Sequence, residues 1–338
     1  MKKNPLHHTT CFACALLLLT ASTGCGKSTS TLSGQHEVST SERTAASTTL
    51  PALTGKLVYH SYRSYGAVSK LYLYNFATNQ LTWISQSWNI YDPMNAHFNN
   101  DGTKIVFMGE ATKGGKWDIY LWTVGSTSAP VNLTAGDGCR DEDPKFSPNG
   151  TKICFKQTPA GGVGNLKIMD LNGVITNSVT NNTIESGMPY FTKDSAALLY
   201  ARGAGSTSDI YMVNVDGTND HALANVSGVQ EYYPIVRDSA TFLYTRWVSA
   251  TNQSDQVYLG YFANNTRTSL PFNTTNADYS DAFPCDSSKV VLSCDKTGGS
   301  GAYDLYIADM TSGSMYSLSS YNTGINTSLN ELGACYTK

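Results

Sequence analysis

Acidic residues recur along the chain at nearly even intervals. One carboxylate holds a similar place in each interval, and the series is Asp92, Asp141, Glu185, Glu231, Asp278 and Glu331. Glu142 and Asp143 add charge beside its second member. If the intervals are structural repeats that superpose, these side chains ring one mouth of a channel. Such a ring would attract a basic partner or a divalent cation such as calcium or manganese. In the alternative, each carboxylate accepts backbone N–H groups of its own turn.

Aromatic and imidazole side chains stand close to the same positions. The tyrosines are Tyr91, Tyr190, Tyr232, Tyr233 and Tyr279. We expect Tyr232 and Tyr279 to contribute to ligand binding, because a tyrosine offers a sugar or peptide both ring area and a hydroxyl group. Packing between repeats is the alternative. His60 and His97 are the two histidines that could approach the channel, and they are the candidates for imidazole ligands of a metal.

The sequence gives no catalytic set. It has no Gly-x-Ser-x-Gly motif and no defensible Ser-His-Asp order. No CxxC pair occurs beyond the first residues, and the cysteine spacing fits no zinc pattern. We therefore assign no catalytic residue and no cofactor other than the divalent cation considered above.

The acidic residues are positioned by an internal repeat of 45 to 48 residues. Each copy has an apolar anchor, a polar turn and a β-rich run, as in PKFSPNGTKICF at 144–155. The anchors are Phe98, Phe146, Phe191, Val236 and Phe283. A second element with alternating apolar and polar residues recurs six times, as in SDIYMVNVDG at 208–217. Asn-Gly or Asp-Gly turns after some copies lead to a further strand.

Each repeat thus predicts a four-stranded antiparallel unit. Six such units around an axis predict an all-β protein, a six-bladed β-propeller over residues 55–338. The first unit lacks its inner strand, while Tyr336 near the C-terminus stands at an anchor position. We expect the C-terminal strand to complete the first blade and close the ring, which removes two open edges.

These repeats resemble those of the TolB-type propeller family, where a proline and an aromatic anchor precede a Ser-Pro-Asp-Gly turn. DPKFSPNGTKICF at 143–155 is the closest copy, and the resemblance covers residues 55–338. It implies the fold but little about function. The α/β domain that precedes the propeller in periplasmic TolB proteins is not expected here, so we do not carry over their role in envelope integrity.

Two functions fit this pattern. The first is a non-catalytic binding scaffold that displays a propeller mouth to an envelope protein, a peptide or a glycan. The second is a metal-assisted glycan lyase, because oligogalacturonate lyases use a similar propeller with histidine and a divalent metal near the axis. Such a lyase needs a base and a cation. His60 or His97 could be the base, but clustered histidine ligands are missing, so we favour the scaffold.

Residues 1–24 have the plan of a secretory signal: Lys2 and Lys3, an apolar run, and small residues before Cys25. The segment resembles a bacterial lipoprotein signal, which implies cleavage before Cys25 and lipid on its thiol. Ordinary cleavage at a nearby small residue is the alternative. Gly26-Lys27-Ser28 imitates a phosphate loop, but no strand precedes it and no helical pattern follows.

Residues 25–54 are rich in serine and threonine and predict a solvated tether. We therefore expect a monomer on the bacterial cell envelope, periplasmic or surface-facing, that meets the membrane only through its lipid. A net charge of −3 without a basic run argues against nucleic acid. Five cysteines remain in the domain, and they allow at most two disulfides with the pairing open: Cys139, Cys154, Cys285, Cys294 and Cys335.

Overall fold

Short runs of β-branched and aromatic residues, separated by Gly, Asn and Asp turns, form 24 strands within the residues that the structure describes. The structure is a computed structural model, and it describes residues 49–62 and 68–338. Residues 52–338 form one compact unit. The predicted signal peptide, Cys25 and nearly all of the predicted tether lie outside the described residues.

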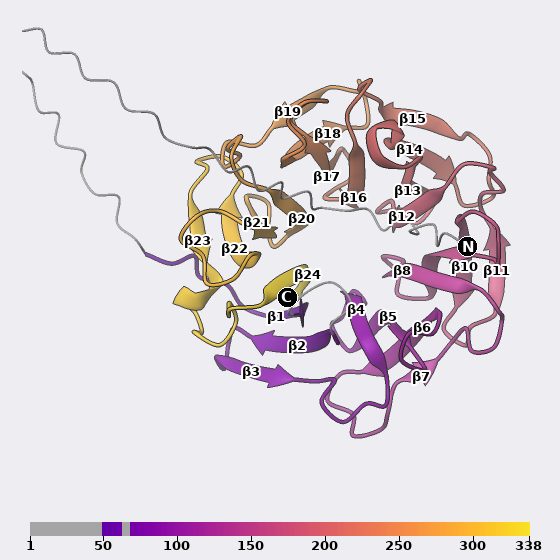
Figure 1. The fold of residues 1–338 in the computed structure, drawn as a ribbon, viewed down its shortest axis with the longest axis horizontal. Helices are drawn as coiled ribbons and strands as arrows, with labels where there is room; N and C mark the ends of the chain where they lie inside the picture. Colours follow the sequence, from indigo (N-terminus) through magenta and orange to yellow (C-terminus); the bar gives the residue numbers. More distant parts are fainter. Residues whose placement is uncertain (1–48, 63–67) are drawn as a thin grey trace, which may run out of the picture. The chain divides into compact units, whose positions relative to one another are not determined.

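Six four-stranded antiparallel sheets surround a central axis (Figure 1). The prediction of a six-bladed propeller is therefore confirmed. With strands given from the axis outwards, the first blade is β24 (Asn330–Thr337), β1 (Lys56–Tyr62), β2 (Lys70–Asn75) and β3 (Gln80–Trp83), and the second is β4 (Tyr91–Phe98), β5 (Lys104–Glu110), β6 (Trp117–Thr123) and β7 (Val131–Asn132). The third blade is β8 (Arg140–Phe146), β9 (Lys152–Thr158), β10 (Asn165–Asp170) and β11 (Ile175–Ser178), and the fourth is β12 (Ser186–Phe191), β13 (Ala197–Arg202), β14 (Asp209–Asn214) and β15 (His221–Ala224). The fifth blade is β16 (Glu231–Val236), β17 (Thr241–Trp247), β18 (Asp255–Tyr261) and β19 (Arg267–Ser269), and the sixth is β20 (Tyr279–Pro284), β21 (Lys289–Cys294), β22 (Asp304–Asp309) and β23 (Met315–Ser317).

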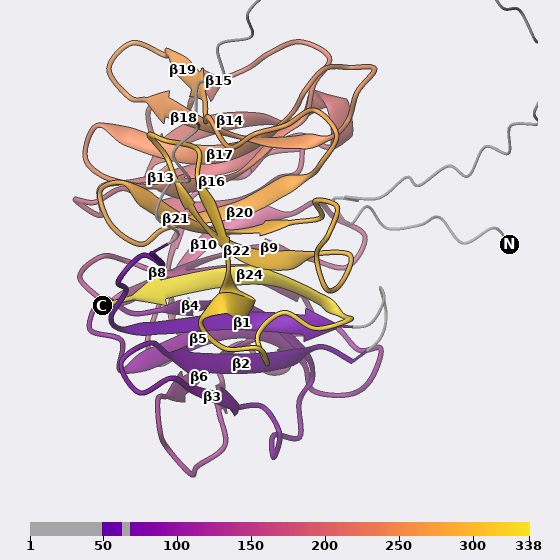
Figure 2. The same cartoon turned by 90° about the vertical axis from the view of Figure 1, so that its left-hand side faces the viewer.

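The last strand closes the ring as the sequence predicts. β24 pairs antiparallel with β1, with Tyr336 opposite Leu57 and Cys335 opposite Val58. Figure 2 shows the two strands side by side. The first blade therefore consists of one C-terminal and three N-terminal strands, and no inner edge stays open between the first and last blades.

The hydrophobic core lies between neighbouring blades. One buried cluster joins Leu57 and Tyr336 of the first blade to Val291 and Ile307 of the sixth. Another joins Val106 and Ile119 of the second blade to Phe155 of the third. Each sheet thus buries its faces against its neighbours, which is why a single repeat would not be stable alone.

Each inner strand carries a bulge at the same point. One residue there adopts a left-handed conformation with φ between 48° and 61°: Asn95, Asp143, Met188, Tyr233, Asp281 and Gly333. The strand pairing shifts register beside it, for example between Glu142 and Lys145. Non-glycine residues rarely adopt positive φ, and bulges redirect the side chains that they carry.

The anchor of the sixth blade differs by one residue from the sequence prediction. Phe146 pairs with Ile153, and the equivalent pair in the sixth blade is Pro284 with Val290. Pro284 is therefore the anchor, and the assignment of Phe283 was wrong. Because strand side chains alternate between faces, the shift of one residue turns Phe283 towards the channel instead.

The described residues also bear on disulfides and on membrane-spanning helices. The five cysteines of the propeller are free thiols. Over the same residues, the chain has no helix with the length and apolar character needed to cross a membrane.

Candidate functional site

The inner strands enclose a cavity of about 40 Å³ on the propeller axis. Because one buried water needs roughly 10–15 Å³ by the same kind of measure, the cavity admits a few waters or one small chemical group. All six bulge residues line it, and we call them the bulge ring: Asn95, Asp143, Met188, Tyr233, Asp281 and Gly333. Lys145, His97 and Phe283, each two residues after a bulge residue, line it as well.

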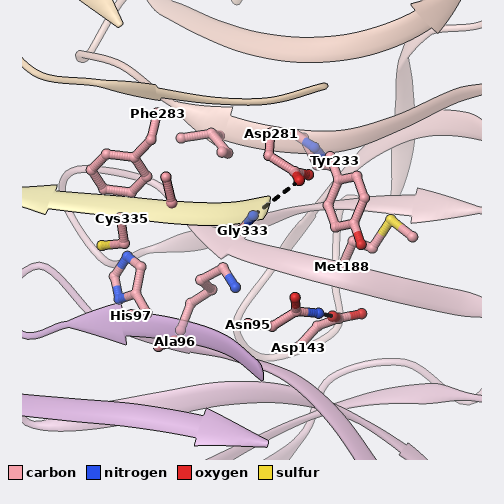
Figure 3. Close-up of a pocket in the computed structure, with 14 residues that line it drawn as sticks. Asn95, Ala96, His97, Asp143, Met188, Tyr233, Asp281, Phe283, Gly333 and Cys335 are labelled. Atoms are coloured by element: carbon pink, nitrogen blue, oxygen red, sulfur yellow. Dashed lines mark hydrogen bonds between the residues drawn. The ribbon is translucent and has the colours of Figure 1, made fainter. Parts of the chain in front are cut away.

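The bulge ring is polar on one side. The Asn95 amide donates to Asp143 Oδ1 at 2.7 Å, and the Gly333 N–H donates to Asp281 Oδ2 at 3.3 Å (Figure 3). Burial raises the pKa of Asp281 to about 6, against the opposing influence of Lys145. Two carboxylates and one ammonium group therefore share a small space, with a net charge of −1 once Asp281 ionises.

The two candidate histidines both lie beside this cavity. The Phe146 N–H donates to His97 Nδ1 at 3.2 Å, so Nε2 carries the proton and faces the Tyr190 hydroxyl at 3.3 Å. His60 is 5% exposed, its Nδ1 has no hydrogen-bond partner, and its ring occupies the space beside Gly333. Burial, followed by the charge of Lys145, lowers the pKa of both imidazoles, that of His60 to about 3.

Metal binding by these histidines stays a prediction. Both ring nitrogens of His97 are engaged, so coordination there would require the loss of one contact. Across the part of the chain that the structure describes, no three His, Cys, Asp or Glu side chains converge as metal ligands.

The six predicted carboxylates fall into two sets, and none of them lines the cavity. Asp92, Glu185 and Asp278 stand three residues before a bulge residue. Each accepts a backbone N–H from the preceding blade, where its third strand begins. The donors are Ser69, Gly164 and Asp255, all at 2.8 Å. These three side chains therefore connect neighbouring blades.

Asp141, Glu231 and Glu331 stand two residues before a bulge residue, and all three are 0% exposed. Glu231 accepts the Val226 N–H at 3.1 Å, and Glu331 accepts the Thr327 N–H at 3.2 Å. Both donors belong to the loop before the strand. Burial raises the pKa of both glutamates.

Asp141 differs from these two glutamates. Thr134 and Gln157 approach its carboxyl group, but neither oxygen has a hydrogen-bond partner of good geometry. Burial, and then the negative charge of Asp137, raises the pKa of Asp141 to about 8. The six acids thus have unequal surroundings, which the near-regular spacing did not indicate.

The remaining predicted site residues are buried side chains with protein partners. Tyr232 and Tyr279 are each 2% exposed; the Tyr232 hydroxyl donates to Asp255 at 2.5 Å, and that of Tyr279 lies 2.8 Å from the Thr274 hydroxyl. Glu142 bonds Lys156 at 2.7 Å and Arg140 at 3.0 Å. These cations hold its pKa below the usual range although burial opposes them. Whether these residues contact a ligand stays a prediction.

Most of the cavity lining was not predicted from the sequence. Asp281, Met188 and Asn95 were not singled out, and Asp143 was noted only as extra charge. A signal was present: every bulge residue is followed directly by proline or alanine, as in Asn95-Ala96 and Asp143-Pro144. Alignment on that small residue would have found the whole ring.

The sequence itself supplies the family. The family model for the TolB β-propeller domain, PD40, matches residues 33–233, which is more than half of the chain. The chain belongs to the TolB β-propeller domain family. No curated protein gives a sequence match.

Several solved structures share the fold of this TolB β-propeller. TolB from Acinetobacter baumannii matches with a TM-score of 0.53 and 16% identity, over 81% of this chain and 75% of that one. Hydrazine synthase from Kuenenia stuttgartiensis matches with a TM-score of 0.68 and 15% identity, over 85% of this chain but only 47% of that one. An oligogalacturonate lyase from Vibrio parahaemolyticus matches with a TM-score of 0.53 and 12% identity, over 77% of this chain and 79% of that one. At such identities the likeness concerns the fold alone.

Proposed function

We propose that this TolB-type propeller is a non-catalytic binding scaffold of the bacterial cell envelope. Its channel takes a basic group, a lysine or arginine side chain or an amino terminus, presented by a protein or peptide. A glycan ligand is the alternative within the same class of function.

One observation carries the proposal. Six positions that are equivalent in the fold hold five different residue types, from Asp143 and Asp281 to Met188, Tyr233 and Gly333. If the left-handed conformation alone decided these positions, Gly, Asn and Asp would be expected throughout. Met188 and Tyr233 are poor choices for such a backbone. The variety therefore points to a role for the side chains that face the cavity.

Charge selects the class of ligand. Asp143 and Asp281 outnumber Lys145 at the cavity, and a narrow space with low-dielectric walls concentrates the resulting field. A cationic group that enters gains charge-assisted hydrogen bonds to carboxylates, which are stronger than neutral ones. An anionic sugar would instead be repelled by the net negative charge of the cavity.

Nothing at the cavity favours the lyase alternative. A catalytic base must be free to take a proton, whereas His97 already accepts the Phe146 N–H, and His60 is enclosed. We therefore keep the scaffold as the proposal.

A peptide array tests it. Heptapeptides of glycine and serine with one central arginine or lysine should bind at least about tenfold more tightly than the same peptides with norleucine, since one charge-assisted hydrogen bond is worth about 1.5–3 kcal/mol. The double variant Asp143→Asn/Asp281→Asn should lose this preference, and Asp92→Asn, outside the cavity, should keep it. Equal binding of the norleucine peptides, or selective binding of neutral oligosaccharides, would refute the proposal of a basic ligand.

The envelope location rests on the signal sequence, and it makes a separate prediction. If Cys25 carries lipid, the Cys25→Ala protein should move from the detergent phase to the aqueous phase in a Triton X-114 partition, because acyl chains supply about 0.8 kcal/mol per buried methylene. Cys139→Ala, a change within the propeller, serves as the control and should leave the partition unchanged. A Cys25→Ala protein that stays with detergent would place the anchor elsewhere.

A further inference from the structure

The side chain of Asp141 is an anomaly among the buried acids of this fold. It is 0% exposed, and neither carboxylate oxygen has a hydrogen-bond partner of good geometry, although the Thr134 hydroxyl and the Gln157 amide approach it. No salt bridge within the described residues includes Asp141; Arg140 and Lys156 pair with Glu142, the next residue in the chain. An ionised carboxylate in that position costs several kcal/mol unless something compensates its charge.

The equivalent positions in two other blades show what compensates there. The loop before Glu231 donates the Val226 N–H, and the loop before Glu331 donates the Thr327 N–H and hydroxyl, the latter at 2.7 Å. At the corresponding place before Asp141, the loop from Leu133 to Cys139 presents Asp137, a second carboxylate. This loop therefore brings a second acceptor, Asp137, beside a buried acid that the Thr134 hydroxyl of the same loop also approaches.

The position of Asp137 is fixed by its own contacts. Its Oδ1 accepts the Cys139 N–H at 2.7 Å, and its Oδ2 accepts the side-chain amide of Gln157 at 2.9 Å. Gln157 is the residue paired directly opposite Asp141 between β8 and β9. Asp137 thus bonds the residue that pairs with Asp141, and both carboxylates lie at the same end of the blade.

We propose that Asp137, in the loop between β7 and β8, and Asp141, at the start of β8, bind a calcium ion together. The groups around it are oxygen donors, namely the two carboxylates and the Thr134 hydroxyl, and hard divalent cations prefer such donors. Calcium also accepts irregular geometry and completes its shell with carbonyl groups and water. The two carboxylates and the hydroxyl supply only part of such a shell, so we expect a weak site; a zinc site would need nitrogen or sulfur ligands. This inference is independent of the peptide-binding proposal.

Thermal melting with and without calcium tests the site. Charged side chains around the site include Asp118, on which the charge of Asp137 acts, Lys116, whose ammonium group bonds the Gly138 carbonyl, and Lys167, which acts with Lys116 on neighbouring Cys139. In 5 mM CaCl₂ the melting temperature should rise by about 3 °C over that in EDTA, as expected for a native-state ligand with a submillimolar Kd. Isothermal titration calorimetry should give one site per chain.

Three variants test whether the calcium-dependent shift in melting temperature comes from this site. Asp141→Asn and Asp137→Asn should each remove the calcium shift, whereas Glu331→Gln, the equivalent acid with a loop donor, should keep it. Asp141→Asn should melt in EDTA at or above the wild-type temperature, which verifies that it folds. Absence of a calcium shift in the wild-type protein, a shift that survives both Asp137 and Asp141 changes, or a shift lost equally in Glu331→Gln would each overturn the proposal.

Discussion

Deletion of residues 330–338 should lower the melting temperature by more than about 10 °C or prevent folding altogether. The deletion removes β24, and with it the buried side chains of Cys335 and Tyr336 and the strand partner of β1. Removal of one buried aromatic side chain costs about 3–5 kcal/mol, and in a domain of this size each kcal/mol corresponds to about 2–4 °C. The open edge of β1 should also promote aggregation.

Two controls make this result specific to ring closure. A synthetic peptide of residues 330–338, added to the truncated protein, should restore part of the melting temperature, because it can occupy the vacant place beside β1. Deletion of residues 26–48, which precede the propeller, should leave the transition unchanged. A truncated protein that melts like the full chain would show that the pairing between β24 and β1 contributes little.

The architecture was predictable because it depends on patterns that a sequence displays directly. Alternating residues and short turns define strands, and a repeat such as PKFSPNGTKICF defines the unit. Closure of the ring by the C-terminal strand was predicted because the first unit lacked an inner strand and Tyr336 stood at an anchor position. These inferences need no knowledge of where any single side chain points.

The channel was harder to predict, because its lining depends on one residue of register. Phe283 was predicted as the anchor because it is aromatic, whereas Pro284 holds the anchor position in the structure. The bulge residues share a backbone conformation rather than a residue type, so no composition rule selects Asn95 and Met188 together. The small residue that follows each bulge is the better marker, since it reflects a constraint common to all blades.

The carboxylates were found, but their surroundings were not. The similar spacing placed Asp92, which bonds the preceding blade, in one set with Asp141, which is buried without a hydrogen-bond partner of good geometry. Hydrogen-bond partners come from loops that are distant in sequence, and spacing carries no information about them. Their chemical difference therefore required the three-dimensional structure.

Substitution of Asp281 should affect stability and binding in opposite directions. Burial raises the pKa of this carboxyl group from 3.8 to about 6 in the folded protein. An acid with a raised folded pKa binds more protons in the native state than in the unfolded state, so stability falls as pH rises from about 4 through 6. Above that range its ionisation costs up to about 3 kcal/mol. Asp281→Asn should therefore raise the melting temperature at pH 7.5 by several degrees.

The same variant should lose affinity for the arginine heptapeptide by about tenfold at pH 7.5, because one of two carboxylates at the cavity is gone. Wild-type affinity should itself fall between pH 7 and 5, as Asp281 takes up its proton, and the affinity of Asp281→Asn should vary much less over that range. At pH 3.5 the two proteins should melt alike, since the wild-type group is then largely neutral in both states. Asp92→Asn, whose carboxylate bonds the Ser69 N–H outside the cavity, is the matched control and should show neither effect. If Asp281→Asn melts below the wild-type protein at pH 7.5, the carboxylate stabilises the fold through its bond to Gly333. Its position at the channel would then serve stability, and the proposal that it destabilises the fold in order to bind a ligand would be wrong.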